Sequence, residues 1–187
     1  ERIIVLDLGS HYSQMIVRKI REQGVFSELF SHNIKASEIQ KMKNVKGIIL
    51  SGGASFNTLL IDEEIYQLGI PILSICYGSY VSINILGGVV DTTGKSEYAK
   101  GEISITSNSP IFTGIPDKLV VWKLNGNRIK SLPDGFTVSA TCNSCQYEVI
   151  QDTKRKIYLL QFHPEVKATE YGKEILANFI FHICEAQ

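Results

Sequence analysis

The stretch Pro71-Ile72-Leu73-Ser74-Ile75-Cys76-Tyr77-Gly78 decides the fold that we expect of this chain. Its apolar run is too short for a helix and suits a fully buried strand, with the proline at the strand start, where a missing N–H does least harm. After Gly78 the apolar spacing becomes helical and ends at Gly87-Gly88. Cys76 therefore lies on a tight strand-to-helix turn, at a helix N-terminus that favours negative charge.

The segments before this stretch alternate in the same way between strand and helix patterns. Continuous apolar runs predict buried strands, and apolar residues at helical spacing predict the helices between them. Such alternation predicts an α/β fold, with a central, mostly parallel sheet flanked by helices, as in flavodoxin-like folds. The expected strands are 3–8, 25–29 and 45–50, and the expected helices are 12–20, 36–42 and 61–68.

From about residue 89 the pattern changes to short alternating segments joined by turns. We expect a β-rich C-terminal half, mixed or antiparallel, whose strands extend the sheet, and a closing helix over residues 169–184. The expected strands are 102–106, 119–122, 136–140, 147–151 and 157–162. We expect a single domain over residues 1–187.

Charge and composition limit the classes of partner. The chain has 19 basic and 19 acidic residues, which argues against binding to nucleic acid or to an anionic membrane surface through bulk charge. No apolar run approaches the roughly 18 residues needed to span a bilayer. Four cysteines in a chain of this length are weak support for disulfides, so we expect a cytoplasmic protein with a small ligand or a protein partner.

A cysteine nucleophile needs a base and a group that orients the base. His163 directly follows a predicted strand, and Glu165 lies two residues further on, beyond a proline that stiffens the backbone. This spacing can place the imidazole and the carboxylate on one side. Taken alone, His-Pro-Glu is also typical of a turn with a solvated acid, and a lone cysteine is more often a buried core residue.

A thiolate that attacks a carbonyl group also needs hydrogen-bond donors for the oxyanion. The backbone N–H of Tyr77, one residue past Cys76, is one candidate. Gly52 and Gly53 follow the strand 45–50, and the backbone of Gly53 can come close to a reacting group because glycine has no Cβ. A glycine pair after a strand can equally be only a tight turn.

These pieces together resemble the class I glutamine amidotransferases, and within them the amidotransferase portions of GMP synthetases. The resemblance covers essentially the whole chain. It rests on four motifs: Ile48-Ile49-Leu50-Ser51-Gly52-Gly53, Ile75-Cys76-Tyr77-Gly78, Gln161-Phe162-His163-Pro164-Glu165-Val166 and Thr169-Glu170-Tyr171-Gly172-Lys173-Glu174-Ile175-Leu176.

The resemblance implies a mechanism for glutamine hydrolysis. Cys76 would attack the side-chain amide of glutamine, His163 would protonate the departing ammonia, and Glu165 would orient His163. Gly53 and Tyr77 would form the oxyanion hole, and Gly52, Gly53 and Gly78 would contact the substrate. It also implies no metal and no cofactor in this domain, because ATP and Mg²⁺ belong to an ATP-dependent synthetase, fused or separate, that uses the ammonia to aminate XMP.

Several positions depart from the motifs of the family. Ser79 and Tyr80 stand where Met-Gln is usual, Leu124 replaces a serine, Ala54 replaces a proline, and Ser74 replaces a glycine. The family glutamine helps to hold the substrate, and a phenol cannot both donate and accept as an amide does. Three functions therefore stay open: a glutaminase component, a hydrolase of another amide or γ-glutamyl compound, and a catalytically silent binding or regulatory subunit.

One further motif lies outside these four. Cys142-Asn143-Ser144-Cys145 has the spacing of half a zinc site or of a redox pair. No second pair at metal-ligand spacing accompanies it, and its surroundings predict a β-turn. We therefore expect structural thiols there.

Overall fold

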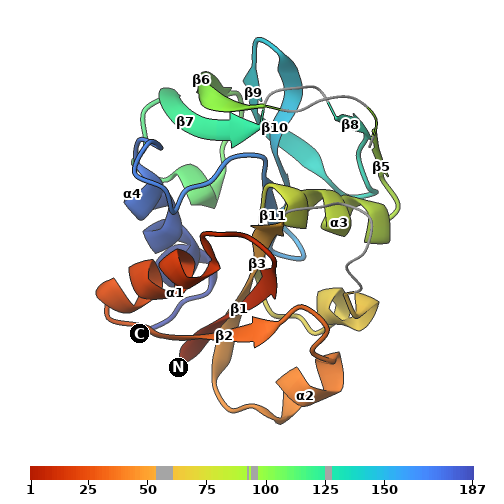
Figure 1. Ribbon diagram of the computed structural model, residues 1–187, viewed down its shortest axis with the longest axis vertical. Coiled ribbons are helices and arrows are strands. Elements are labelled where there is room, and N and C mark those ends of the chain that lie inside the picture. The colour runs from red at the N-terminus through yellow and green to blue at the C-terminus, as the bar shows by residue number, and fades with distance from the viewer. Residues whose placement is uncertain (54–60, 92, 94–96, 125–127) are drawn as a thin grey trace.

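The computed structural model describes residues 1–53, 61–91, 93, 97–124 and 128–187. Ala54 and the stretch 125–127, which were compared above with family motifs, lie outside these residues. In the described part, nine strands form one sheet in the order β2-β1-β3-β4-β11-β10-β9-β6-β7 (Figure 1). A two-stranded sheet joins β5 (Val89–Val90) to β8 (Ile129–Ser131).

The first five strands in that order are parallel to one another. They are nearly continuous apolar runs with both faces covered, as expected for a parallel sheet. This half confirms the predicted α/β class. Its strands are β1 (Arg2–Leu8), β2 (Phe26–Ser31), β3 (Val45–Gly53), β4 (Ile72–Ile75) and β11 (Ile157–Leu160).

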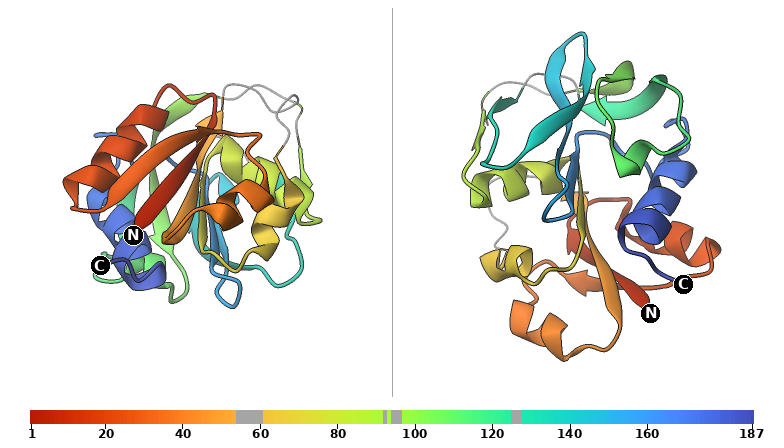
Figure 2. Two further views of the ribbon diagram at one scale, coloured as in Figure 1. Left: turned by 90° about the horizontal axis from the view of Figure 1, so that it is seen from below. Right: turned by 180° about the vertical axis from the view of Figure 1, so that it is seen from behind.

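Helices cover both faces of the parallel half (Figures 1 and 2). Helices α1 and α4 lie on one face, and α3 lies on the other, packed on β3, β4 and β11. The helices are α1 (Ser13–Glu22), α2 (Ala36–Lys41), α3 (Tyr77–Ile85) and α4 (Gly172–Ala177). Short 3₁₀ turns occur at η1 (Glu63–Gln67) and η2 (Pro110–Phe112), and α4 continues as the π-helical η3 (Asn178–Ile183).

The other four strands are antiparallel and form the upper part of the molecule in Figure 1. An isolated bridge pairs Lys123, near the end of β7, with Phe162, just past β11. The edge strand β7 is therefore brought back against the segment that carries His163. The strands are β6 (Tyr98–Ile105), β7 (Lys118–Leu124), β9 (Thr137–Cys142) and β10 (Cys145–Asp152).

Three predicted elements differ in extent from the observed ones. The helix expected over 61–68 is only the short turn η1, and the strand expected over 102–106 begins earlier, at Tyr98. The closing helix begins at Gly172 rather than at residue 169. A Cβ on Gly172 would overlap the carbonyl oxygen of Pro164, so the helix start packs directly on the segment that follows His163.

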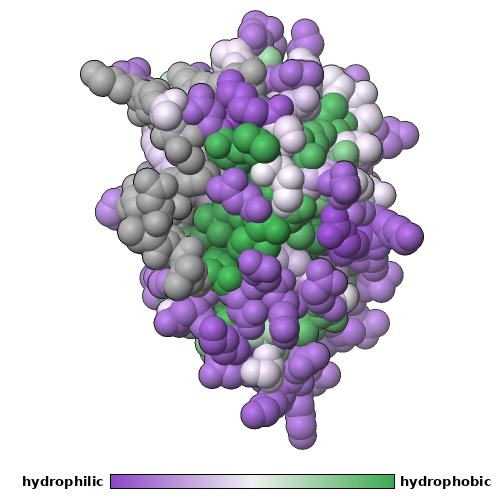
Figure 3. All heavy atoms as spheres, turned by 90° about the vertical axis from the view of Figure 1, so that its right-hand side faces the viewer, coloured by the Kyte–Doolittle hydropathy of each residue, from purple (hydrophilic) through white to green (hydrophobic). Residues whose placement is uncertain are grey.

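Most large apolar side chains are buried in one continuous core. Figure 3 shows that the face on the right-hand side of Figure 1 nevertheless keeps a band of apolar groups between polar ones. Val89 is among the most exposed apolar residues, at 52%. Among the described helices, none is long and apolar enough to cross a lipid bilayer.

Candidate active site

Cys76 lies at the turn between β4 and α3, as predicted, and its backbone is strained. Its φ of 52° and ψ of −112° fall in a region that residues with a Cβ rarely adopt. The Cys76 N–H donates to the carbonyl oxygen of Leu160 on β11 at 2.8 Å, and the Cys76 carbonyl accepts from the N–H of Ser79 at 2.9 Å. These bonds on both sides hold the turn in its strained conformation.

Gly78 allows helix α3 to approach strand β3 closely. A Cβ at this position would lie 2.6 Å from the carbonyl oxygen of Ser51 and 2.9 Å from that of Leu50. Backbone atoms cannot move aside as a flexible side chain can, so the position favours glycine. The predicted contact of Gly78 with a substrate remains a prediction.

His163 and Glu165 lie beside Cys76 because β11 pairs directly with β4. The His163 N–H donates to the carbonyl oxygen of Trp122 at 3.0 Å, and the hydroxyl of Thr169 donates to the His163 carbonyl oxygen at 2.6 Å. The two Glu165 carboxylate oxygens lie 3.2 and 3.3 Å from the Nδ1 atom of His163. Both side chains are buried. The structure thus brings the predicted triad together.

Gly52 makes room for this arrangement. A Cβ at Gly52 would lie 2.9 Å from the Cε1 atom of His163 and 3.6 Å from the Cβ of Cys76. The backbone at the end of β3 therefore passes next to both the nucleophile and the base. This close approach is the property that predicted the glycine pair as a backbone donor site.

Electrostatics favour a charged imidazole at His163. Burial lowers the pKa of His163, but hydrogen bonds to Cys76 and Glu165, together with the charges of both groups, outweigh burial and raise it to about 10. The base is therefore protonated near neutral pH in the empty site, and it can act as the acid for a leaving group.

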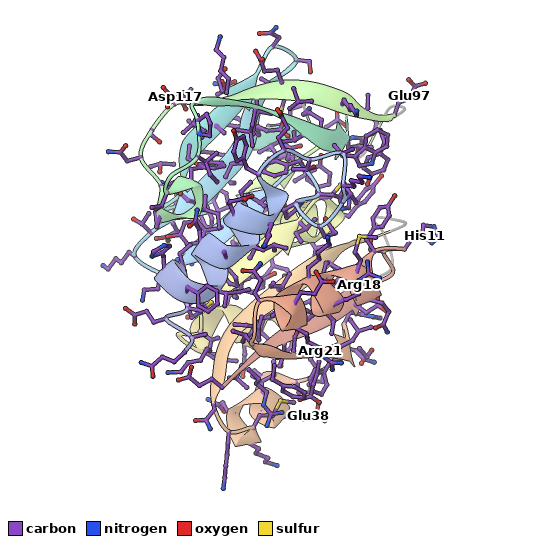
Figure 4. The ribbon with its side chains drawn as sticks, turned by 90° about the vertical axis from the view of Figure 1, so that its left-hand side faces the viewer. His11, Arg18, Arg21, Glu38, Glu97 and Asp117 are labelled. Atoms are coloured by element: carbon purple, nitrogen blue, oxygen red, sulfur yellow. The ribbon has the colours of Figure 1, made fainter. Side chains whose placement is uncertain are left out.

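A cavity of about 370 Å³ opens beside the triad. Gly53 and Tyr77, the two predicted oxyanion residues, line it. His11 also lines it, and Figure 4 shows this side chain at the outer edge of the molecule. The full lining is Gly9, Ser10, His11, Tyr12, Gly53, Tyr77, Tyr98, Trp122 and His163.

Tyr98 is a site residue that the sequence analysis missed. Its hydroxyl lies 3.2 Å from the Sγ atom of Cys76 and 3.2 Å from the Nε2 atom of His163. Its ring stacks on Trp122, with the ring centres 6.0 Å apart. The Cys76 side chain is completely covered from solvent, whereas Tyr98 is 39% exposed. Tyr98 therefore covers the thiol and hydrogen-bonds to both reacting groups.

The substitutions at Ser79 and Tyr80 affect a buried layer and not the lining of this cavity. The Tyr80 hydroxyl donates to the Oε1 atom of Gln161 at 2.6 Å, and the Ser79 hydroxyl donates to the carbonyl oxygens of Ser74 and Leu160. Both side chains are fully buried. Neither they nor Leu124 are among the residues that line the cavity. These substitutions therefore join α3 to β4 and β11.

Strain at Cys76 predicts a difference between two variants that both lack the thiol. Cys76→Gly should be more stable than Cys76→Ala by about 1 kcal/mol, because glycine adopts a positive φ without a Cβ clash. Urea unfolding of the two proteins measures the difference. A more stable alanine variant would contradict a strained turn.

The cover formed by Tyr98 predicts how fast the thiol reacts. Cys76 should be alkylated by iodoacetamide several-fold faster in Tyr98→Ala, because the ring that covers the sulfur is gone. Tyr98→Phe keeps the ring and its stacking on Trp122, and it serves as the matched control with a rate near that of the parent. Equal rates in the alanine variant and the parent would show that another group covers the thiol.

Glu165→Gln should lower the pKa of His163, because the isosteric amide removes a negative charge beside Nδ1. A histidine pKa that folding raises from 6.5 to about 10 contributes stability fully below 6.5, and this contribution is lost as the pH rises to about 10. The stability difference between parent and variant should therefore shrink over this interval. NMR titration of the imidazole and urea unfolding at several pH values measure the two effects, and an unchanged or higher pKa in the variant would refute the assignment.

Comparison with known proteins assigns the family. Residues 4–183 match the family described as glutamine amidotransferase class-I. A curated relative, the GMP synthase [glutamine-hydrolyzing] of Staphylococcus aureus strain MSSA476, is 47% identical over 191 residues, a match that covers 100% of this chain and 37% of that protein. The chain thus spans little more than a third of the length of the curated relatives that it matches.

Solved structures agree with this match. A putative GMP synthase protein from Thermoplasma acidophilum is 33% identical, with a TM-score of 0.86 over 98% of this chain and 94% of the other. PurLQS from Thermotoga maritima is 16% identical, with a TM-score of 0.72 over 97% of this chain and 98% of the other, and it shares the fold. The chain belongs to the class I glutamine amidotransferase family.

Proposed function

We propose that the chain is the glutamine-hydrolysing component of a GMP synthetase. The observation that carries this proposal is the arrangement of Cys76, His163 and Glu165 at the edge of a cavity that Gly53 and Tyr77 also line. The identity of 47% to a GMP synthase supports this substrate class over those of other amidotransferases. The ammonia would serve an ATP-dependent synthetase domain or subunit, where ATP and Mg²⁺ are expected.

The first half of the reaction forms a thioester. The Cys76 thiolate attacks the side-chain amide carbon of glutamine, and the backbone N–H groups of Gly53 and Tyr77 would stabilise the negative charge on the amide oxygen. The His163 imidazolium then gives its proton to the departing nitrogen, which leaves as ammonia. Its high pKa in the empty site supports this role, because the proton is already in place.

The second half returns the enzyme to its starting state. His163, now neutral, accepts a proton from a water molecule that attacks the thioester carbon, and the carbon–sulfur bond breaks to give glutamate and the Cys76 thiolate. Glu165 keeps Nδ1 of the imidazole fixed, so that Nε2 faces the reacting atoms through both steps. The net change is glutamine plus water to glutamate plus ammonia.

The cavity lining suggests how the reaction depends on a partner. Among the described residues that line the cavity, none is a lysine, arginine, aspartate or glutamate. The α-amino and α-carboxylate groups of glutamine therefore find no opposite charge there. In addition, the Tyr98 hydroxyl lies between Cys76 and His163, where the amide would bind. Both features favour a low activity in isolation that rises when a synthetase partner docks.

An ammonia-release assay tests the proposal. Glutamine should give ammonia slowly with this chain alone and faster after addition of a synthetase that aminates XMP, while Cys76→Ser should abolish release in both cases. Asparagine and a γ-glutamyl dipeptide serve as competing substrates. Preferred turnover of one of them would favour the alternative hydrolase, and no release from any of them with the synthetase present would favour a silent subunit.

A further inference from the structure

A second pair of cysteines lies in the hairpin of β9 and β10. Cys142 and Cys145 are paired directly across the two-residue turn Asn143-Ser144. Both are free thiols, and their Sγ atoms lie within 4.8 Å of each other. Cys142 is partly exposed and Cys145 is buried, so reagents reach the first thiol before the second.

The buried side of this pair faces two charged groups. A carboxylate oxygen of Glu148 lies within 4.8 Å of both sulfurs, and the Nζ atom of Lys123 lies 3.2 Å from Oε2 of Glu148. Both charged side chains are almost completely buried. Burial raises the pKa of the Glu148 carboxyl, against the opposing charge of Lys123 and the hydrogen bonds from the two thiols. The carboxylate is thus a proton acceptor in contact with the thiols.

We propose that Cys142 and Cys145 form a reversible intramolecular disulfide by exchange with a small disulfide such as oxidised glutathione. Directly opposed residues of an antiparallel pair have Cα atoms about 4.5 to 5.5 Å apart. Disulfides span Cα separations of about 4.4 to 6.8 Å, so the bond can form without a large backbone movement. The CxxC spacing, read above as structural thiols, then has a chemical use.

The exchange has two balanced steps. The Cys142 thiolate attacks one sulfur of oxidised glutathione, which forms a mixed disulfide and releases one glutathione thiolate. Cys145 then passes its proton to Glu148 and attacks the Cys142 sulfur, which releases the second glutathione thiolate. Burial first of all raises the pKa of the Cys145 thiol to about 12, which supports its place as the second and not the first attacking group.

The disulfide would alter a contact that reaches the triad. The Sγ atom of Cys145 accepts a hydrogen bond from the Nε2 of Gln161 at 3.1 Å, and Oε1 of Gln161 accepts one from the Tyr80 hydroxyl. Gln161 lies two residues before His163, and Tyr80 lies on the helix that begins after Cys76. A Cys145 sulfur bonded to Cys142 no longer accepts from Gln161 in the same way, so oxidation loosens the link between the two catalytic segments.

The same atoms could instead ligate a metal ion, since two thiolates and a carboxylate are typical zinc ligands. Here the ammonium of Lys123 lies against the carboxylate, which disfavours a cation at that place. Metal binding is therefore the competing outcome of the test.

The test uses the whole chain with Cys76→Ser, so that the nucleophile does not react. After incubation in a glutathione redox buffer, the intact mass should fall by two hydrogen atoms, and a peptide map should show Cys142 linked to Cys145. With Cys145→Ser, a glutathione adduct should accumulate on Cys142. With Cys142→Ser, the buried Cys145 should form neither product.

Two results would overturn the disulfide. One is a glutathione adduct that persists on Cys142 although Cys145 is present. The other is a stoichiometric zinc ion that shields both thiols from alkylation. A dithiol should reverse the expected product and restore both free thiols.

The link to the triad has a separate readout that rests on the proposed function. With Cys76 intact, oxidation should lower glutamine turnover more in the parent than in Cys142→Ser, and a dithiol should restore it. Equal losses in both proteins, with the disulfide present in the parent, would refute the link through Gln161 but not the disulfide. No turnover in the reduced parent with its synthetase would count against the proposed function instead.

Discussion

The parallel pairing of β4 with β11 is the contact on which the site depends. Leu160 is in register with Ile75, and its carbonyl oxygen accepts the N–H of Cys76 at 2.8 Å. The carboxyl ends of neighbouring parallel strands meet at one edge of a sheet, so the residues that follow the two strands become neighbours. The nucleophile comes from the middle of the chain and the base from near its end, and this one pairing brings them together.

The site is also crowded, and the surrounding core maintains the crowding. Cys76 has a positive φ, and Gly52 and Gly78 are placed where a Cβ would meet His163 or the backbone of β3. Strain of this kind persists only where the surrounding structure fixes it. The buried strands β3, β4 and β11 do this, because a thiol at the sheet edge cannot relax without disturbing them. The rigid parallel half thereby positions the reactive turn.

The sequence was sufficient to predict the triad but not the groups that surround it. Cys76, His163 and Glu165 follow strands or turns that apolar runs and glycines mark clearly. Tyr98 was missed because its strand begins before the alternating pattern does, and its place over Cys76 depends on how β6 and β7 curl. Tyr80 was read as a change in substrate contact, whereas its side chain points to Gln161 in a buried layer. The charged pair of Lys123 and Glu148 joins two distant strands, and no local pattern indicates it.

The central claim is that Cys76 is the nucleophile of a glutamine-binding site. Its most direct test is the intact mass of the protein after reaction with a diazoketone analogue of glutamine, with a synthetase partner present and with peptide mapping of the product. We expect one adduct, on Cys76, that excess glutamine prevents and that Tyr98→Ala does not redirect to another residue. An adduct on Cys142, Cys145 or Cys184 instead, or labelling of Cys76 that glutamine does not slow, would contradict it.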